Sequence, residues 1–173
     1  MKKIVFIISL FSIGLFAQEK KDYSANVATL DSTIATLYTV VSGEKGVKRD
    51  WVLFKHLFHN NAKLIPAGTS SEGKKAVRYM SSDDYITTSG NWFDRNGFYQ
   101  KETQRTVETF GNITHVFSSY ESYKTKGDET PFLKGVNSIQ LFNDGTRWWI
   151  INLYWAQESK NKPMPKPHLR KKE

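Results

Sequence analysis

The chain between residues 98 and 123 carries the side chains with the clearest capacity for chemistry. Gly111-Asn112 separates two runs of alternating polar and apolar residues, which is typical of a β-hairpin with a two-residue turn. Pairing Phe110 with Ile113 across this turn divides the side chains between two faces, because successive residues of a strand point to opposite sides. The face that meets a cavity therefore decides what kind of site the hairpin builds.

One face of the predicted hairpin is acidic and holds a histidine. Its members are Glu102, Gln104, Glu108, His115, Phe117, Ser119 and Glu121. Glu102 and His115 are the candidate catalytic residues, because a carboxylate and an imidazole at one pocket can act as general acid and base. The alternative is that this face meets water or a second copy of the chain, since burying three unpaired carboxylates is costly. In that case Glu108 is the cross-strand neighbour of His115 and pairs with it.

The other face suits binding rather than catalysis. Its members are Thr103, Arg105, Val107, Thr114, Val116, Ser118 and Tyr120. If this face is concave, Arg105 and Tyr120 point into a pocket beside Asn137, and a few polar groups in an apolar cavity are what a small-molecule site requires. Arg105 would favour a carboxylate or another oxyanion on the ligand. The alternative is that Arg105 reaches the rim while Tyr120 packs in the core.

The elements that position this hairpin follow from the spacing of apolar residues. Apolar side chains recur every three or four residues from 27 to 41 and again from 51 to 58, which predicts two helices. Ser81 and Asp84 predict the capped start of a third helix. A strand is expected from Ala62 to Ile65, stopped by Pro66. From Gly97 onward four strand-like runs follow, and helices before antiparallel strands indicate an α+β fold.

The second hairpin is predicted to turn at Asn143-Asp144-Gly145, with Phe142 opposite Thr146. This register places one set of apolar residues in the core: Ile139, Leu141, Trp149, Ile151, Leu153 and Trp155. The opposite face of the last strand carries Trp148, Ile150 and Tyr154. That is too much apolar surface for a sheet facing water, so we expect a homodimer interface there.

Three stretches occur in a suggestive order: Arg49-Asp50-Trp51 to Phe58-His59, Phe110-Gly111-Asn112 to Ser118-Ser119-Tyr120-Glu121, and Gly145-Thr146-Arg147-Trp148-Trp149-Ile150 to Trp155. In this order they resemble the nuclear transport factor 2-like superfamily, in its SnoaL-like, ketosteroid isomerase-like branch, over residues 27 to 158. The resemblance implies a cone-shaped α+β fold, with three N-terminal helices packed on a strongly bent, mostly antiparallel sheet around an apolar pocket. Such proteins are often homodimers.

Members of that superfamily include isomerases, cyclases, dehydratases, epoxide hydrolases and proteins that only bind, so the fold alone does not settle catalysis. The position that corresponds to the carboxylate base of the isomerases is Pro66. The nearest counterpart of their helix tyrosine is Thr36, with Tyr38 about half a turn away. An isomerase mechanism is therefore not transferred.

The pocket is predicted to be lined by Tyr38, Trp92, Arg105, Ser118, Tyr120, Asn137, Trp149 and Trp155. We expect an exported protein that binds a partly polar, oxygen-bearing small molecule. The alternative is an isomerase, dehydratase or cyclase using acid–base chemistry in the same pocket. No cofactor and no metal site are expected, because the chain has no cysteine and only His56 and His59 have a ligand-like spacing, without a third ligand nearby.

The charge of the chain is concentrated at its ends. The net charge is +8, but residues 18 to 159 hold 17 basic and 16 acidic residues, which excludes a basic nucleic-acid-binding face. Residues 1 to 17 resemble a secretory signal peptide, with Lys2 and Lys3 before an apolar run that ends at Ala17. A polar leader over 18 to 26, a domain over 27 to 158 and a disordered basic tail over 159 to 173 follow. We expect a periplasmic or secreted protein without a membrane-spanning segment after cleavage.

Overall fold

The computed structural model describes residues 21–70, 72–159 and 163–164. The elements are α1 (Ser24–Val27), α2 (Leu30–Val40), α3 (Trp51–Leu57), β1 (Phe58–Thr69), β2 (Lys75–Val77), α4 (Ser82–Asn96), β3 (Tyr99–Phe110), β4 (Ile113–Tyr123), β5 (Leu133–Asn143) and β6 (Trp148–Gln157). The expected signal peptide lies outside the described residues, as do residues 18–20 of the leader and most of the basic tail. Within the described residues, no helix is long and apolar enough to cross a membrane.

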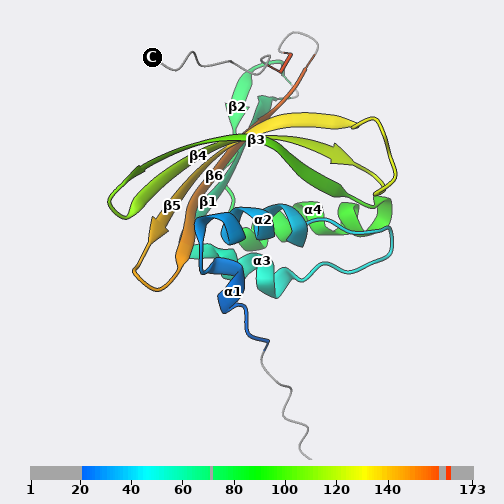
Figure 1. Ribbon diagram of the computed structural model, residues 1–173. Helices are drawn as coiled ribbons and strands as arrows, with labels where there is room; N and C mark the ends of the chain where they lie inside the picture. Colours follow the sequence, from blue (N-terminus) through cyan, green and yellow to red (C-terminus); the bar gives the residue numbers. More distant parts are fainter. Residues whose placement is uncertain (1–20, 71, 160–162, 165–173) are drawn as a thin grey trace, which may run out of the picture.

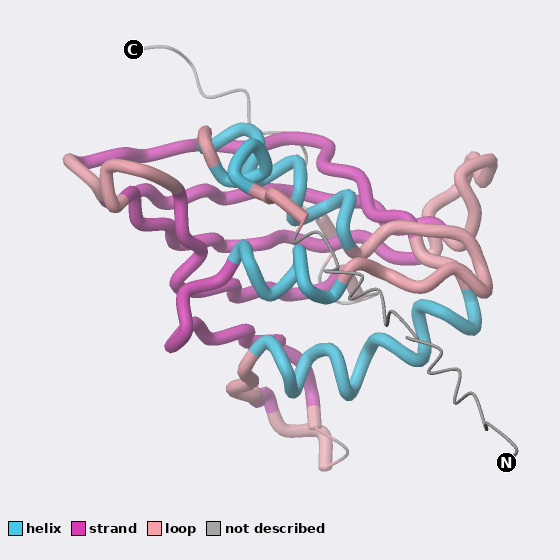
Figure 2. The backbone as a smooth tube through the Cα atoms, turned by 90° about the horizontal axis from the view of Figure 1, so that it is seen from below, coloured by secondary structure: helices cyan, strands magenta, loops and turns pink. Residues whose placement is uncertain are grey.

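The strands form one sheet in the order β2-β1-β6-β5-β4-β3. All neighbouring pairs are antiparallel except β1 and β6, which run in parallel. The sheet curls over the helices (Figure 1), and the helices cover one of its faces (Figure 2). The predicted α+β fold with a bent, mostly antiparallel sheet is confirmed.

The helices begin at the caps that their sequences offer. Ser81 and Asp84 form the predicted capping box of α4, and the Asp50 side chain accepts a hydrogen bond from the Leu53 N–H at the start of α3. The single helix expected over 27 to 41 is instead two, because the extended backbone of Thr29 caps α2 and leaves α1 as one separate turn.

Pro66 does not stop β1, contrary to the prediction. It pairs with Trp155 of β6, and its carbonyl accepts the Arg78 N–H at 3.2 Å. A proline removes only its own N–H from a ladder, so the strand continues through its carbonyl to Thr69.

The core lies between the helices and the concave face of the sheet. Ile34 of α2, Leu57 of α3 and Leu64, Ile139 and Ile150 of the sheet are completely buried. Each such aliphatic side chain stabilises the fold by roughly 1.5–3 kcal/mol relative to leaving it in water.

The first hairpin has the predicted turn but not the predicted register throughout. Phe110 pairs with Ile113, and Gly111 takes the positive φ of +57° that its turn position requires. Thr103 is an extra residue in β3, so Gln104 pairs with Ser119 while Glu102 pairs with Tyr120. This β-bulge turns the strand over, and Glu102 joins the concave face instead of the outer one.

The second hairpin departs further from its prediction. Its loop is Asp144–Arg147, so Phe142 pairs with Trp149 rather than Thr146. This three-residue shift exchanges the two faces near the turn. Ile150 is therefore buried and Trp148 packs against the core, while Ile151 is 38% exposed. The predicted core positions of Trp149 and Ile151 are wrong, and so is an interface through Trp148 and Ile150.

A second bulge restores the predicted faces beyond this point. Ile151 is the extra residue, between the pairs Leu141–Ile150 and Gln140–Asn152. Leu153 and Trp155 consequently share the inner face with Ile139, as predicted, and Tyr154 is exposed on the outer face as predicted.

Candidate functional site

A cavity of about 300 Å³ lies between helices α2, α3 and α4 and the concave face of the sheet. Its walls are mainly apolar, with Leu37 from α2, Phe93 from α4 and Leu153 from β6. The polar groups of the wall are Ser89, Gln100, Asn137, Gln157 and the hydroxyls of Tyr85 and Tyr120. The residues that line it include no aspartate, glutamate, histidine, lysine or arginine.

Four of the eight residues predicted for the pocket line this cavity: Trp92, Tyr120, Asn137 and Trp155. Tyr38 and Ser118 lie behind the wall, where both are buried. Arg105 and Trp149 do not line it. Whether the four lining residues hold a ligand stays a prediction.

Three buried side chains connect the cavity wall to Glu102. The Asn137 amide Nδ2 donates to the Tyr38 hydroxyl at 2.9 Å, and that hydroxyl lies 2.7 Å from the Ser118 Oγ. Ser118 in turn donates to Oε1 of Glu102 at 2.5 Å. Burial raises the pKa of Tyr38 to about 12, although its bonds to Ser118 and Asn137 oppose this rise. The Tyr38 phenol is therefore protonated at neutral pH.

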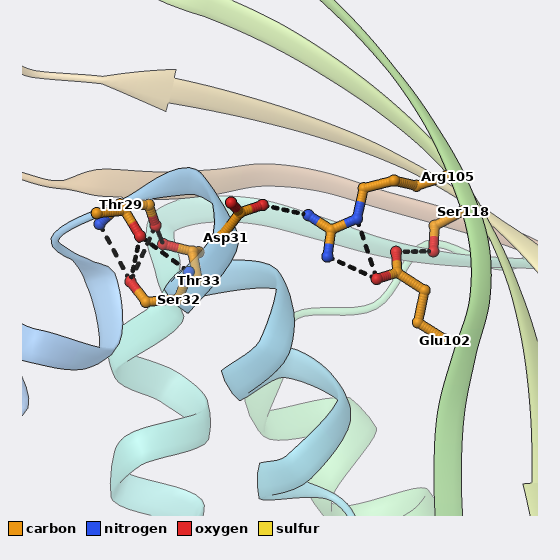
Figure 3. A network of polar contacts seen from close by, with 7 residues as sticks. All are labelled: Thr29, Asp31, Ser32, Thr33, Glu102, Arg105 and Ser118. Carbon is orange, nitrogen blue, oxygen red and sulfur yellow. Dashed lines mark hydrogen bonds and ion pairs between the residues drawn. The ribbon is translucent and has the colours of Figure 1, made fainter.

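Arg105 holds the far end of this chain. Its Nε and Nη2 donate to Oε2 of Glu102 at 3.0 and 2.6 Å, and its Nη1 donates to Asp31 at 2.7 Å (Figure 3). Asp31 stands in the first turn of α2 and is 88% exposed. The Arg105 guanidinium is thus occupied by two carboxylates, and the prediction that it faces the pocket and attracts an acidic ligand is wrong.

Glu102 and His115 lie on opposite faces of the sheet. His115 is on the outer face, where its cross-strand neighbour is Glu108 and its Nε2 lies 2.9 Å from the Ser138 Oγ. The bulge at Thr103 separates the candidate catalytic pair, because it moves Glu102 inward and leaves His115 in place. The two side chains cannot serve one shared point in the cavity.

Trp149 belongs to the outer face, near the β5–β6 loop. Its indole N–H donates to Oδ2 of Asp144 at 2.7 Å, and the Arg147 guanidinium stacks on its ring at 3.5 Å. The bonds from Trp149 and Thr146 hold the pKa of Asp144 well below its usual range. Trp149 thus stabilises a loop and takes no part in the cavity.

Tyr85 lines the cavity but is not among the residues predicted for the pocket. It shares one face of α4 with Ser89 and Trp92, at spacings of four and three residues, and this spacing was the available signal. Burial raises the pKa of Tyr85 and of Tyr120. Neither hydroxyl forms a hydrogen bond with any described residue, so both are available to a molecule in the cavity.

In the described part of the chain, no three His, Cys, Asp or Glu side chains gather where they could hold a metal ion.

Solved structures with the same fold are numerous, although no protein-family model and no curated protein sequence matches the chain. A protein from Nostoc punctiforme with a cystatin-like fold is 10% identical, with 75% of this chain and 89% of that one covered and a TM-score of 0.57. An NTF2-like protein with a cystatin-like fold from Novosphingobium aromaticivorans is 12% identical, with 75% and 81% covered and a TM-score of 0.56.

A third similar structure, also from Novosphingobium aromaticivorans, is provisionally named as the beta subunit of an aromatic-ring-hydroxylating dioxygenase. It is 11% identical, with 75% of this chain and 86% of that chain covered and a TM-score of 0.56. At such identities the likeness concerns the fold and not the activity. The curled sheet, the helices on its concave face and these similar structures together show that the chain has the nuclear transport factor 2-like fold.

Proposed function

We propose that this protein binds a small, uncharged, oxygen-bearing molecule in the cavity, without converting it. The observation that carries the proposal is the composition of the wall, which is apolar and aromatic with a few hydroxyl and amide groups and no ionisable acid or base apart from tyrosine. Such a wall gains free energy from an apolar ligand and orients its oxygen atoms by hydrogen bonds. A charged ligand would lose its hydration without gaining an opposite charge.

The same composition favours binding over the isomerase, dehydratase or cyclase alternative. Those reactions need a positioned base, and the carboxylate of Glu102 is connected to the cavity wall only through Ser118 and Tyr38. Glu102 is also held by Arg105.

The test uses 2-naphthol as an uncharged probe and 2-naphthoate as an anion of similar shape. Binding is followed by isothermal titration and by the change in the total tryptophan fluorescence, to which Trp92 and Trp155 of the cavity wall contribute. We expect 2-naphthol to bind and 2-naphthoate to bind at least about tenfold more weakly. Equal or tighter binding of the anion would contradict the proposal.

A matched pair of variants localises the binding. Ser89→Trp places a large ring in the cavity from α4 and is expected to abolish binding of 2-naphthol. Phe117→Ala removes a ring that is 51% exposed on the outer face and is expected to leave binding unchanged. Circular dichroism of both variants verifies that the fold is kept.

Two expectations from the sequence are part of this proposal. We propose export with removal of residues 1 to 17, which an intact-mass measurement of the secreted protein checks.

We also propose a homodimer through the outer sheet face, where Phe117, Ile151 and Tyr154 are exposed. A monomeric mass by light scattering at all concentrations would contradict the homodimer.

A further inference from the structure

The buried chain from Asn137 to Glu102 has a direction that its hydrogen atoms impose. A carboxylate only accepts hydrogen bonds, so at the 2.5 Å contact between Ser118 and Glu102 the serine hydroxyl is the donor. A hydroxyl has one hydrogen, and Ser118 already donates it to Glu102. At the 2.7 Å contact with Tyr38, Ser118 must therefore accept, and Tyr38 donates.

The same counting fixes the orientation of the Asn137 amide. Tyr38 has given its only hydrogen to Ser118, so its oxygen accepts at the 2.9 Å contact with Asn137. The amide atom there is thus nitrogen, which leaves Asn137 Oδ1 on the other branch of the amide. Asn137 lines the cavity, and its oxygen forms no hydrogen bond with any residue that the structure describes.

We infer that Glu102, acting through Ser118 and Tyr38, turns the Asn137 oxygen toward the cavity as a hydrogen-bond acceptor, so that the cavity selects ligands that bear a hydroxyl group. This inference rests on the proposed binding function and names the ligand class: uncharged aromatic or alicyclic alcohols and phenols. Glu102 is a positioning residue in this arrangement, because it touches no ligand itself. Tyr85 and Tyr120 are free to meet further oxygen atoms of the same molecule.

The direction of the hydrogen bonds from Asn137 to Glu102 requires a carboxylate at position 102, and the reason is its contact with Arg105. Arg105 donates two N–H groups to Oε2 and Ser118 donates its hydroxyl to Oε1, so both carboxylate oxygens accept hydrogen bonds. In Glu102→Gln, the single amide oxygen faces Arg105 and the amide NH₂ faces Ser118. Ser118 then accepts from the glutamine and donates to Tyr38, Tyr38 donates to Asn137, and the Asn137 amide turns its NH₂ to the cavity.

The binding experiment compares 2-naphthol, which donates a hydrogen bond, with 2-methoxynaphthalene, which only accepts. The chain with Glu102 is expected to prefer 2-naphthol by about tenfold, the worth of one hydrogen bond. In Glu102→Gln the preference is expected to disappear or reverse. Glu108→Gln makes the same change on the outer face of the same strand, opposite His115, and should keep the wild-type preference.

A second measurement requires no ligand. In the empty protein, one Nδ2 hydrogen of Asn137 is bonded to Tyr38 and buried, so nuclear magnetic resonance should show one slowly exchanging side-chain amide hydrogen at this residue. Glu102→Gln should abolish this protection, and Glu108→Gln should not.

The two measurements separate the inference from the proposed function. If neither naphthalene binds, the proposed function fails for this probe class, and the amide exchange still decides the direction of the chain. If both bind equally to the chain with Glu102, or if Glu102→Gln leaves the preference or the Asn137 protection unchanged, the inference is overturned while binding itself stands.

Discussion

The sheet contains two single-residue bulges, Thr103 in β3 and Ile151 in β6, and they place opposite kinds of side chain on the concave face. The bulge at Thr103 brings in the carboxylate of Glu102. The bulge at Ile151 lets the strand keep apolar residues inside on both sides of it, with Ile150 before and Leu153 after. One extra residue therefore decides which side chains are buried in each strand, although the alternation of residue types hardly changes.

The two inward residues, Ile150 and Glu102, differ in the contacts that stabilise them on the inner face. Ile150 needs only neighbours to pack against, and its complete burial supplies them. Glu102 needs compensation for leaving water, and it finds Arg105 and Ser118 within hydrogen-bond distance. A bulge that places a charge on the inner face is thus tolerated where the same strand and its neighbour provide partners.

The largest expected effect separates the two isoleucines at the β6 bulge. Ile150→Ala should lower the free energy of unfolding by about 3 kcal/mol, because it leaves a cavity at a fully buried position. Ile151→Ala, one residue later, should cost less than about 1 kcal/mol, because that side chain is already 38% exposed. Chemical denaturation of the two variants checks this; equal costs would place both side chains in similar surroundings and contradict the bulge.

A smaller effect separates the two glutamates of β3. Glu102→Ala should cost about 2 kcal/mol, since it leaves the buried Ser118 hydroxyl without its acceptor and Arg105 with Asp31 alone. Glu108→Ala should change stability by less than about 0.5 kcal/mol, since Glu108 is exposed on the outer face. Urea titrations measure both, and a costly Glu108 with a neutral Glu102 would reverse the assignment of faces.

The smallest expected effect is a pH dependence of stability that comes from Tyr38, the buried phenol behind the cavity wall. The pKa of Tyr38 is raised in the folded protein to about 12, above its ordinary value of 10. Its contribution is fully present below pH 10 and is lost as the pH rises toward 12, at about 1.4 kcal/mol per pH unit. Denaturation at pH 9, 10 and 11 should show this decline, with a shallower slope in Tyr38→Phe; an identical slope in that variant would assign the decline to other tyrosines.

Much of the fold could be predicted because it depends on local signals. The capping box at Ser81, the turn at Gly111 and the alternation of four strands each follow from a few neighbouring residues. The pairing of strands that lie far apart in the sequence was harder to predict. Pro66 suggested the end of a strand, but the strand continues because it pairs in parallel with Trp155 of β6, nearly ninety residues later, and because its carbonyl accepts the Arg78 N–H.

The candidate site could be predicted in part, for the same reason. Tyr120 and Asn137 were placed on the inner face correctly, because no bulge separates them from the positions that fix their register. Glu102 and Trp149 were misplaced, since an extra residue or a longer loop reverses the faces without altering the pattern of residue types. Arg105 was placed on the correct face, but its two carboxylate partners come from a bulge and from α2, which no short segment reveals.

The place of β6 in the sheet has a consequence for how the chain folds. β6 lies between β1 and β5, yet it follows both in the sequence. Until Trp148–Gln157 pairs, the edges of β1 and β5 that face β6 have no partner, and the core between helices and sheet cannot close. Contacts of such long sequence separation form slowly. The closing of the core therefore depends on the last of these strands to appear in the sequence, and it joins the two halves of the sheet in one step.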